Sequence, residues 1–151
     1  MTSYPVRSLS IILTDDDEDD CEIFEEAIEE IDDKVQIDTL QHGKALMDYL
    51  VDTLNELPDI LFLDINMPYK NGYECLEEIR DNPRLKSLCV IIYSTSDSPR
   101  DIKKAYDLGA DAFIQKPSRY EDLKNVLQKV LETDWRNPCF KLEEHHFVLR
   151  A

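Results

Sequence analysis

Polar side chains that could carry out phosphoryl-transfer chemistry follow four apolar segments of this 151-residue chain. An acidic run at 15–17 follows one such segment, and Asp64, Ser94 and Lys116 end or follow three others. Three carboxylates at hydrogen-bonding distance repel one another unless a cation lies among them, and clustered oxygen ligands suit Mg²⁺. A carboxylate beside Mg²⁺ can attack a phosphoryl group and form an aspartyl phosphate, while a lysine and a hydroxyl stabilise the transferred group. The residue types therefore indicate phosphoryl transfer, provided that the fold brings them together.

Alternating strand-like and helical patterns predict the elements that must position these residues. The expected strands are 9–14, 35–40, 59–64, 88–94 and 112–115. The expected helices, from apolar residues at helical spacing, are 19–31, 44–54, 73–81, 99–108 and 120–133. Three of the strands are nearly continuously apolar, which is typical of strands buried on both faces of a parallel sheet. The order predicts a doubly wound α/β fold with helices on both faces, in which the carboxyl ends of the strands form the ligand-binding edge.

Each polar residue also has an ordinary structural explanation when taken alone. The acidic run could cap a helix, and a strand-end serine or a solvent-facing lysine is common. Their combination at the ends of four predicted strands favours a functional site.

Composition excludes several other classes of protein. The chain has 33 acidic and 17 basic residues, for a net charge of −16, so it repels phosphate backbones and we expect no nucleic-acid partner. Its three glycines cannot form a dinucleotide-binding or Walker loop. No apolar run approaches the ~18 residues of a membrane span, which predicts a cytoplasmic protein without a membrane partner. The four scattered cysteines favour reduced thiols over disulfides or zinc.

The sequence resembles the receiver domain of two-component response regulators. The matching stretches are ILTDDDED, DILFLDINMPYKNGYECL, VIIYSTS and GADAFIQKPS, and the resemblance covers residues 9–131 approximately. It implies the flavodoxin-like receiver fold, with a five-stranded parallel sheet in the order 2-1-3-4-5. It also implies a stand-alone receiver over residues 1–133, followed by a tail at 134–151 without a recognisable effector domain.

The same resemblance assigns roles to the site residues. It implies that Asp64 accepts a phosphoryl group from a histidine kinase or a histidine phosphotransfer protein, with Lys116 and Ser94 assisting. The residues implied to bind Mg²⁺ are Asp15, Asp16, Asp64 and the backbone carbonyl of Asn66. Chemistry is then limited to the chain's own phosphorylation and dephosphorylation, so we expect a signalling protein and not an enzyme.

The resemblance further implies how a signal would leave the site. Ser94 and Phe113 match the switch positions, which move together and alter the face made by the fourth helix, fifth strand and fifth helix. Ser94 stands where threonine is commoner in the family and keeps the hydroxyl. Phe113 stands where tyrosine is commoner, so the ring can still be buried but lacks the tyrosine hydroxyl. A cis peptide is expected before Pro117. Because no effector domain is recognised, we expect output through a downstream protein, or through a homodimer at this face.

The tail at 134–151 is open to two interpretations. Its aromatic residues Trp135, Phe140 and Phe147 could form part of a partner or self-association site, or could simply cover the last helix.

Two other functions compete with a phosphorylatable receiver. A phosphoaspartate phosphatase of the haloacid dehalogenase type carries D-x-D after its first strand, but the similar triplet here, Asp64-Ile65-Asn66, follows the third strand and lacks the second acid. A receiver-like interaction module that is never phosphorylated would not need the intact set of polar residues.

Overall fold

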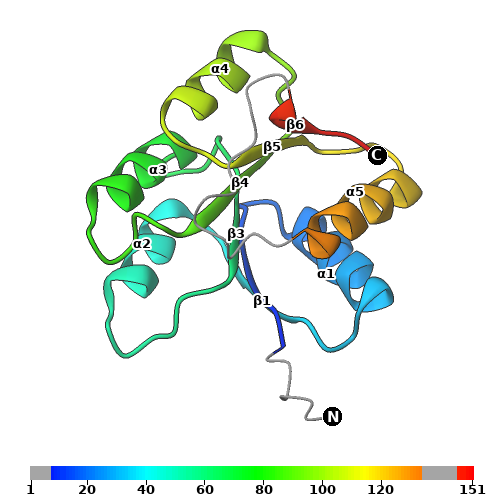
Figure 1. Cartoon of the computed structure of the whole chain (residues 1–151), viewed down its shortest axis with the longest axis horizontal. Coiled ribbons are helices and arrows are strands. Elements are labelled where there is room, and N and C mark those ends of the chain that lie inside the picture. Colours follow the sequence, from blue (N-terminus) through cyan, green and yellow to red (C-terminus); the bar gives the residue numbers. More distant parts are fainter. Residues whose placement is uncertain (1–7, 134–145) are drawn as a thin grey trace, which may run out of the picture.

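A parallel sheet lies between two layers of helices in the computed structural model, which describes residues 8–133 and 146–151 (Figure 1). The strands are β1 (Ser10–Thr14), β2 (Gln36–Leu40), β3 (Ile60–Leu63), β4 (Cys89–Ser94), β5 (Ala112–Gln115) and β6 (Val148–Leu149). The helices are α1 (Glu18–Ile31), α2 (Gly43–Val51), α3 (Gly72–Asp81), α4 (Pro99–Asp107) and α5 (Tyr120–Glu132). The strand order is β2-β1-β3-β4-β5-β6, and every adjacent pair is parallel. The predicted doubly wound α/β fold and the order 2-1-3-4-5 are confirmed.

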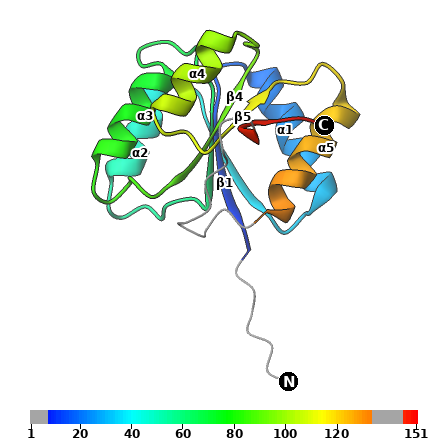
Figure 2. The same ribbon diagram turned by 45° about the horizontal axis from the view of Figure 1, so that its top comes forward.

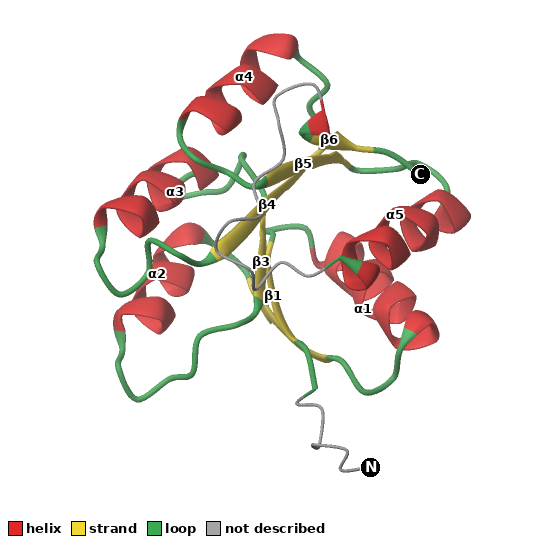
Figure 3. Ribbon diagram, viewed as in Figure 1, coloured by secondary structure: helices red, strands yellow, loops and turns green. Residues whose placement is uncertain are grey.

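The sixth strand was not predicted from the sequence. β6 comes from the tail and pairs with β5 at the edge of the sheet, with Phe113 opposite Val148 (Figure 3). The strand has only two residues, too few for an alternating pattern to identify it. Of the two interpretations of the tail, neither anticipated a strand; Trp135 and Phe140 lie outside the described residues.

The helices cover both faces of the sheet, as predicted. α1 and α5 lie on one side and α2, α3 and α4 on the other (Figure 2). Successive strand residues point to opposite faces, so Ile60 and Phe62 pack toward α1 and α5 while Leu61 and Leu63 pack toward the other layer. Both sets are apolar, which explains why the central strands are continuous apolar runs.

The second helix ends earlier than its apolar pattern predicted. α2 stops at Val51, and Leu54 is 91% exposed instead of lying on a buried helix face. The Asp52 side chain accepts a hydrogen bond from the Leu54 N–H at 3.0 Å, and such local side-chain contacts compete with helix continuation.

A close approach of two backbones fixes the loop that follows β3. The Gly72 N–H donates to the Ile65 carbonyl at 2.9 Å, and a Cβ at Gly72 would lie 2.2 Å from the Asp64 carbonyl oxygen. Only glycine allows this contact, so the start of α3 is held directly against the end of β3. No helix in the part of the chain that the structure describes is both long and apolar enough to cross a membrane.

Candidate functional site

The ends of β1 and β3 bring two predicted carboxylates side by side. Thr14 pairs with Leu63 in the sheet, and the Asp64 N–H donates to the Thr14 carbonyl at 3.0 Å. The next residue after β1, Asp15, therefore lies beside Asp64. Carboxylate oxygens of Asp15, Asp16 and Asp64, called here the acidic cluster, lie within 4.8 Å of one another. Asp15 and Asp64 are buried, whereas Asp16 is exposed.

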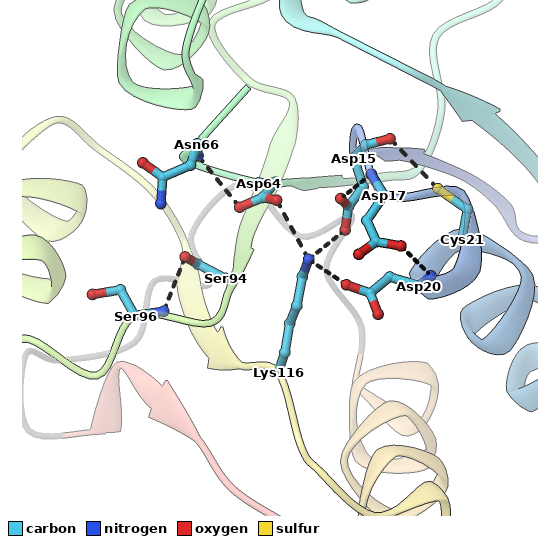
Figure 4. Close-up of polar contacts among 9 residues, drawn as sticks. All are labelled: Asp15, Asp17, Asp20, Cys21, Asp64, Asn66, Ser94, Ser96 and Lys116. Atoms are coloured by element: carbon cyan, nitrogen blue, oxygen red, sulfur yellow. Dashed lines mark hydrogen bonds and ion pairs between the residues drawn. The ribbon is translucent and has the colours of Figure 1, made fainter. Parts of the chain in front are cut away.

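The Lys116 ammonium reaches this cluster from the end of β5. The backbone N–H of Lys116 donates to the Ser94 carbonyl at 2.7 Å. This hydrogen bond continues the β4–β5 pairing and fixes the position of the Lys116 backbone. The ammonium nitrogen Nζ lies 2.7 Å from Asp15 Oδ2, 2.8 Å from Asp20 Oδ2 and 3.4 Å from Asp64 Oδ2 (Figure 4). Burial opposes the charge on Lys116, but contacts with Asp15 and Asp20 outweigh it and hold the pKa of the ammonium above its usual value.

The surroundings of Asp64 change the proton affinity of its carboxyl group. Burial raises the pKa of Asp64 to about 6, and the negative charge of Asp15 adds to this effect, although Lys116 opposes it. The Asn66 N–H also favours the carboxylate, through a long contact of 3.4 Å with Asp64 Oδ1. The Asp64 carboxylate therefore lacks enough nearby positive charge to offset its burial.

The acidic cluster fits a small divalent cation. Asp15 Oδ2 is buried and accepts no hydrogen bond, although it forms an ion pair with Lys116 Nζ at 2.7 Å. Its other oxygen accepts from the Asp17 N–H at 3.0 Å. Carboxylate oxygens are the ligands that hard cations prefer, and one ammonium does not balance the surrounding carboxylates. The residues thus have both the donor atoms and the charge deficit that a divalent metal requires.

The remaining predicted residues lie at the same edge of the sheet or just behind it. Ser94 is fully buried at the end of β4, next to β3, and its hydroxyl oxygen accepts from the Ser96 N–H at 3.2 Å (Figure 4). Phe113 is fully buried on β5, opposite Ile92 of β4. The prediction of a cis peptide bond before Pro117 is wrong, because the described backbone contains no cis peptide bond. A trans X–Pro bond is favoured by about 0.5–1 kcal/mol unless the surroundings select the other isomer.

Sequence reasoning missed Asp20 as a partner of Lys116. It lies in the first turn of α1, where acidic residues are expected as favourable charges near a helix N-terminus, and this explanation concealed a second role. The contact joins residues 96 positions apart in the sequence. It becomes apparent only when the start of α1 is placed beside the end of β5 in the fold.

Sequence reasoning also missed the partner of Phe113. Phe147, just before β6, is 1% exposed, and its carbonyl accepts from the Phe113 N–H at 3.0 Å. The ring centroids of Phe113 and Phe147 are 6.4 Å apart, and Tyr106 of α4 meets Phe147 edge-on at 5.2 Å. An apolar chain of contacts therefore joins β5, the tail and α4.

Comparison with known proteins identifies the family to which this fold belongs. The family model for the response regulator receiver domain matches residues 11–128. The probable methanogenesis regulatory protein FilR2 of Methanothrix harundinacea is 32% identical over 127 residues, which is 81% of each chain. Response regulator Rcp1 of Synechocystis sp. is 29% identical over 129 residues, covering 83% of this chain and 87% of Rcp1.

Solved structures give the same result. The phosphorylated cyanobacterial phytochrome response regulator RcpA has a TM-score of 0.77 at 29% identity, covering 90% of this chain and 99% of RcpA. The Mn²⁺-bound form of Rcp1 has a TM-score of 0.74 at 28% identity, covering 89% and 99%. The chain described here belongs to the response regulator receiver family, whose members act in two-component signal transduction.

Proposed function

We propose that Asp64 is the phosphoacceptor of this receiver and that a histidine kinase or a histidine phosphotransfer protein is the donor. One observation carries the proposal: the buried Asp64 carboxylate lies beside the Lys116 ammonium and within a cluster of two further carboxylates. A carboxylate oxygen of Asp64 forms a bond to phosphorus while the bond from phosphorus to the histidine nitrogen breaks, and the electron pair of that bond stays on the histidine. Lys116 and Ser94 assist by donating to the oxygens of the transferred group.

The proposed metal is Mg²⁺, with Asp15, Asp16, Asp64 and the Asn66 carbonyl as its protein ligands. Support comes from the buried Asp15 Oδ2, which accepts no hydrogen bond, and from the Mn²⁺-bound form of the relative Rcp1. The ion would neutralise charge on the phosphoryl oxygens as they approach Asp64. Because Asp16 is exposed, the ion could reach the acidic cluster from solvent on the side of Asp16.

The proposed switch consists of Ser94 and Phe113. A phosphoryl group on Asp64 would draw the Ser94 hydroxyl away from the Ser96 N–H, and a change at the end of β4 would reach Phe113 on the adjacent β5. Output would leave through the face formed by α4, β5 and α5. In this chain that face includes Phe147, because its ring packs between Phe113 and Tyr106.

We further propose that this chain is a cytoplasmic signalling protein. The reactions that it undergoes would be limited to its own phosphorylation and dephosphorylation. Its output would be a contact with a downstream protein or a homodimer at the α4–β5–α5 face. Sedimentation of the full chain and of a chain ending at Asp134, each with and without a phosphoryl analogue, tests the homodimer. A phosphorylation-dependent increase in mass of the full chain supports it, and four monomeric samples contradict it.

Incubation with a small phosphodonor and Mg²⁺, followed by intact-mass measurement, tests the phosphoacceptor. The wild-type chain should gain one acid-labile phosphoryl group, and Asp64→Asn should gain none. Asp97→Asn is the matched control, because Asp97 is an exposed aspartate in the loop between β4 and α4, outside the acidic cluster. Normal labelling of Asp64→Asn would refute the assignment.

Lys116→Ala tests whether the ammonium couples phosphorylation to the switch. We expect this variant to lose most of the conformational change that a phosphoryl analogue produces, measured by amide NMR shifts on β5 and α4. A variant that accepts the group and changes its spectrum as the wild type does would contradict this role.

A further inference from the structure

Asp20 shares the Lys116 ammonium with two carboxylates of the acidic cluster. Lys116 Nζ donates hydrogen bonds to Asp20 and Asp64 and forms an ion pair with Asp15. The shortest distances, 2.7 and 2.8 Å, are to Asp15 and Asp20, while Asp64 is 3.4 Å away. The ammonium therefore lies closer to the β1–α1 side of the site than to the proposed phosphoacceptor (Figure 4).

The three contacts differ in how easily they can be given up. Asp15 is fully buried, so losing the ion pair with Lys116 would leave a buried carboxylate without a nearby positive charge or access to water. The Asp20 side chain is 34% exposed, so water can replace the ammonium at its carboxylate. Asp64 already has the longest contact, and it is where a phosphoryl oxygen would appear. Asp20 is therefore the partner that Lys116 can release at the lowest cost.

We propose that Asp20 is a positioning residue that holds Lys116 in the resting state and must release it when a phosphoryl group occupies the site. This inference rests on the proposed phosphorylation of Asp64. The Asp20–Lys116 contact is a charge-assisted hydrogen bond, and breaking it opposes binding of the phosphoryl group. Removal of the Asp20 charge should thus favour the phosphorylated state, even though Asp20 is outside the acidic cluster.

Affinity for beryllofluoride, a phosphoryl analogue that binds a carboxylate without covalent transfer, tests the proposal. We expect Asp20→Asn to lower the dissociation constant of beryllofluoride by roughly three- to tenfold at saturating Mg²⁺, the range for a partly exposed charged contact. Calorimetric titration measures the constant, and circular dichroism confirms folding. Asp20→Ser, which also removes the charge, should shift the constant in the same direction.

Asp19→Asn is the matched control. Asp19 carries the same charge in the same first turn of α1 but is exposed, whereas Asp20 contacts Lys116. If Asp20 acted only through the overall negative field on an anionic ligand, both substitutions would tighten binding equally. The proposal requires less than a twofold change in Asp19→Asn.

A double-mutant cycle with Lys116→Met decides whether Asp20 acts through the ammonium. In that background Asp20→Asn should no longer change the dissociation constant. The inference is overturned if the effect persists there, if Asp20→Asn equals Asp19→Asn, or if Asp20→Asn weakens binding. A wild-type chain that fails to bind beryllofluoride with Mg²⁺ would instead refute the proposed function, and the inference with it.

Discussion

Beyond the ends of β1 and β3 lie carboxylates with too little positive charge around them, whereas near β5 and β6 two phenylalanines are completely buried. In the first region Asp64 has a raised pKa and Asp15 Oδ2 has no hydrogen-bond partner. In the second, Phe113 and Phe147 are 0% and 1% exposed and are joined by a backbone hydrogen bond. The two regions share one sheet but contribute to stability with opposite signs.

This difference separates the region proposed to bind Mg²⁺ and the phosphoryl group from a region that contributes to stability through apolar packing. Buried carboxylates without compensating charge reduce folding stability, and natural proteins accept such a cost where a ligand supplies the missing charge. Apolar burial beside β5 contributes stability instead and connects Phe147 to Phe113, the residue proposed as part of the switch. Three measurements can break or sharpen this contrast.

The largest effect should come from the apolar edge. Phe147→Ala removes a fully buried ring and should lower the free energy of unfolding by about 3 kcal/mol, as measured by urea denaturation. Val148→Ala is the control, because it removes a half-buried side chain from β6 itself and should cost about 1 kcal/mol or less. Equal losses in the two variants would mean that Phe147 is not the anchor of the tail.

A substitution in the acidic cluster should raise the free energy of unfolding instead of lowering it. Because burial raises the pKa of Asp64 from 3.8 to about 6 in the folded chain, the contribution of this carboxyl to stability is greatest below pH ~4 and is lost as the pH rises through 6. Asn at this position carries no charge, so Asp64→Asn should be more stable than the wild type at pH 7.5 in chelator, by about 1–2 kcal/mol.

The pH dependence provides the control for that gain. Urea denaturation of Asp64→Asn and the wild type should converge as the pH falls from 7.5 toward 4, while Asp97→Asn should follow the wild type throughout. A gain that is constant across this range would show that charge burial at Asp64 is not its cause.

The smallest effect should come from adding the missing charge. Mg²⁺ at five times its dissociation constant should stabilise the wild type by about 1 kcal/mol, as expected for a ligand that binds only the folded state. Asp16→Ala should lose most of this stabilisation. Phe147→Ala should keep it, because Phe147 packs beside Phe113 of β5 and is not part of the acidic cluster. An unchanged Mg²⁺ titration of Asp16→Ala in a thermal melt would refute Asp16 as a ligand.

Local patterns were sufficient to predict most of the fold. The apolar runs at β1, β3 and β4 and the helical spacing of α1 and α5 depend on neighbours within one element, so a single sequence displays them. Strand ends follow from the same runs, and Asp15, Asp64, Ser94 and Lys116 were therefore expected at one edge. Their roles in phosphoryl transfer remain predictions.

Features that depend on distant segments could not be predicted in the same way. β6 is two residues long and exists only because β5 offers an edge, and the burial of Phe147 depends on Phe113 and on Tyr106 of α4. Asp20 was indistinguishable from an ordinary first-turn acid until the end of β5 was placed beside the start of α1. Periodicity and strand ends are properties of the local chain, and the sequence alone determined them; the partners of Lys116 and Phe113 are set by packing between elements, which only the tertiary structure decided.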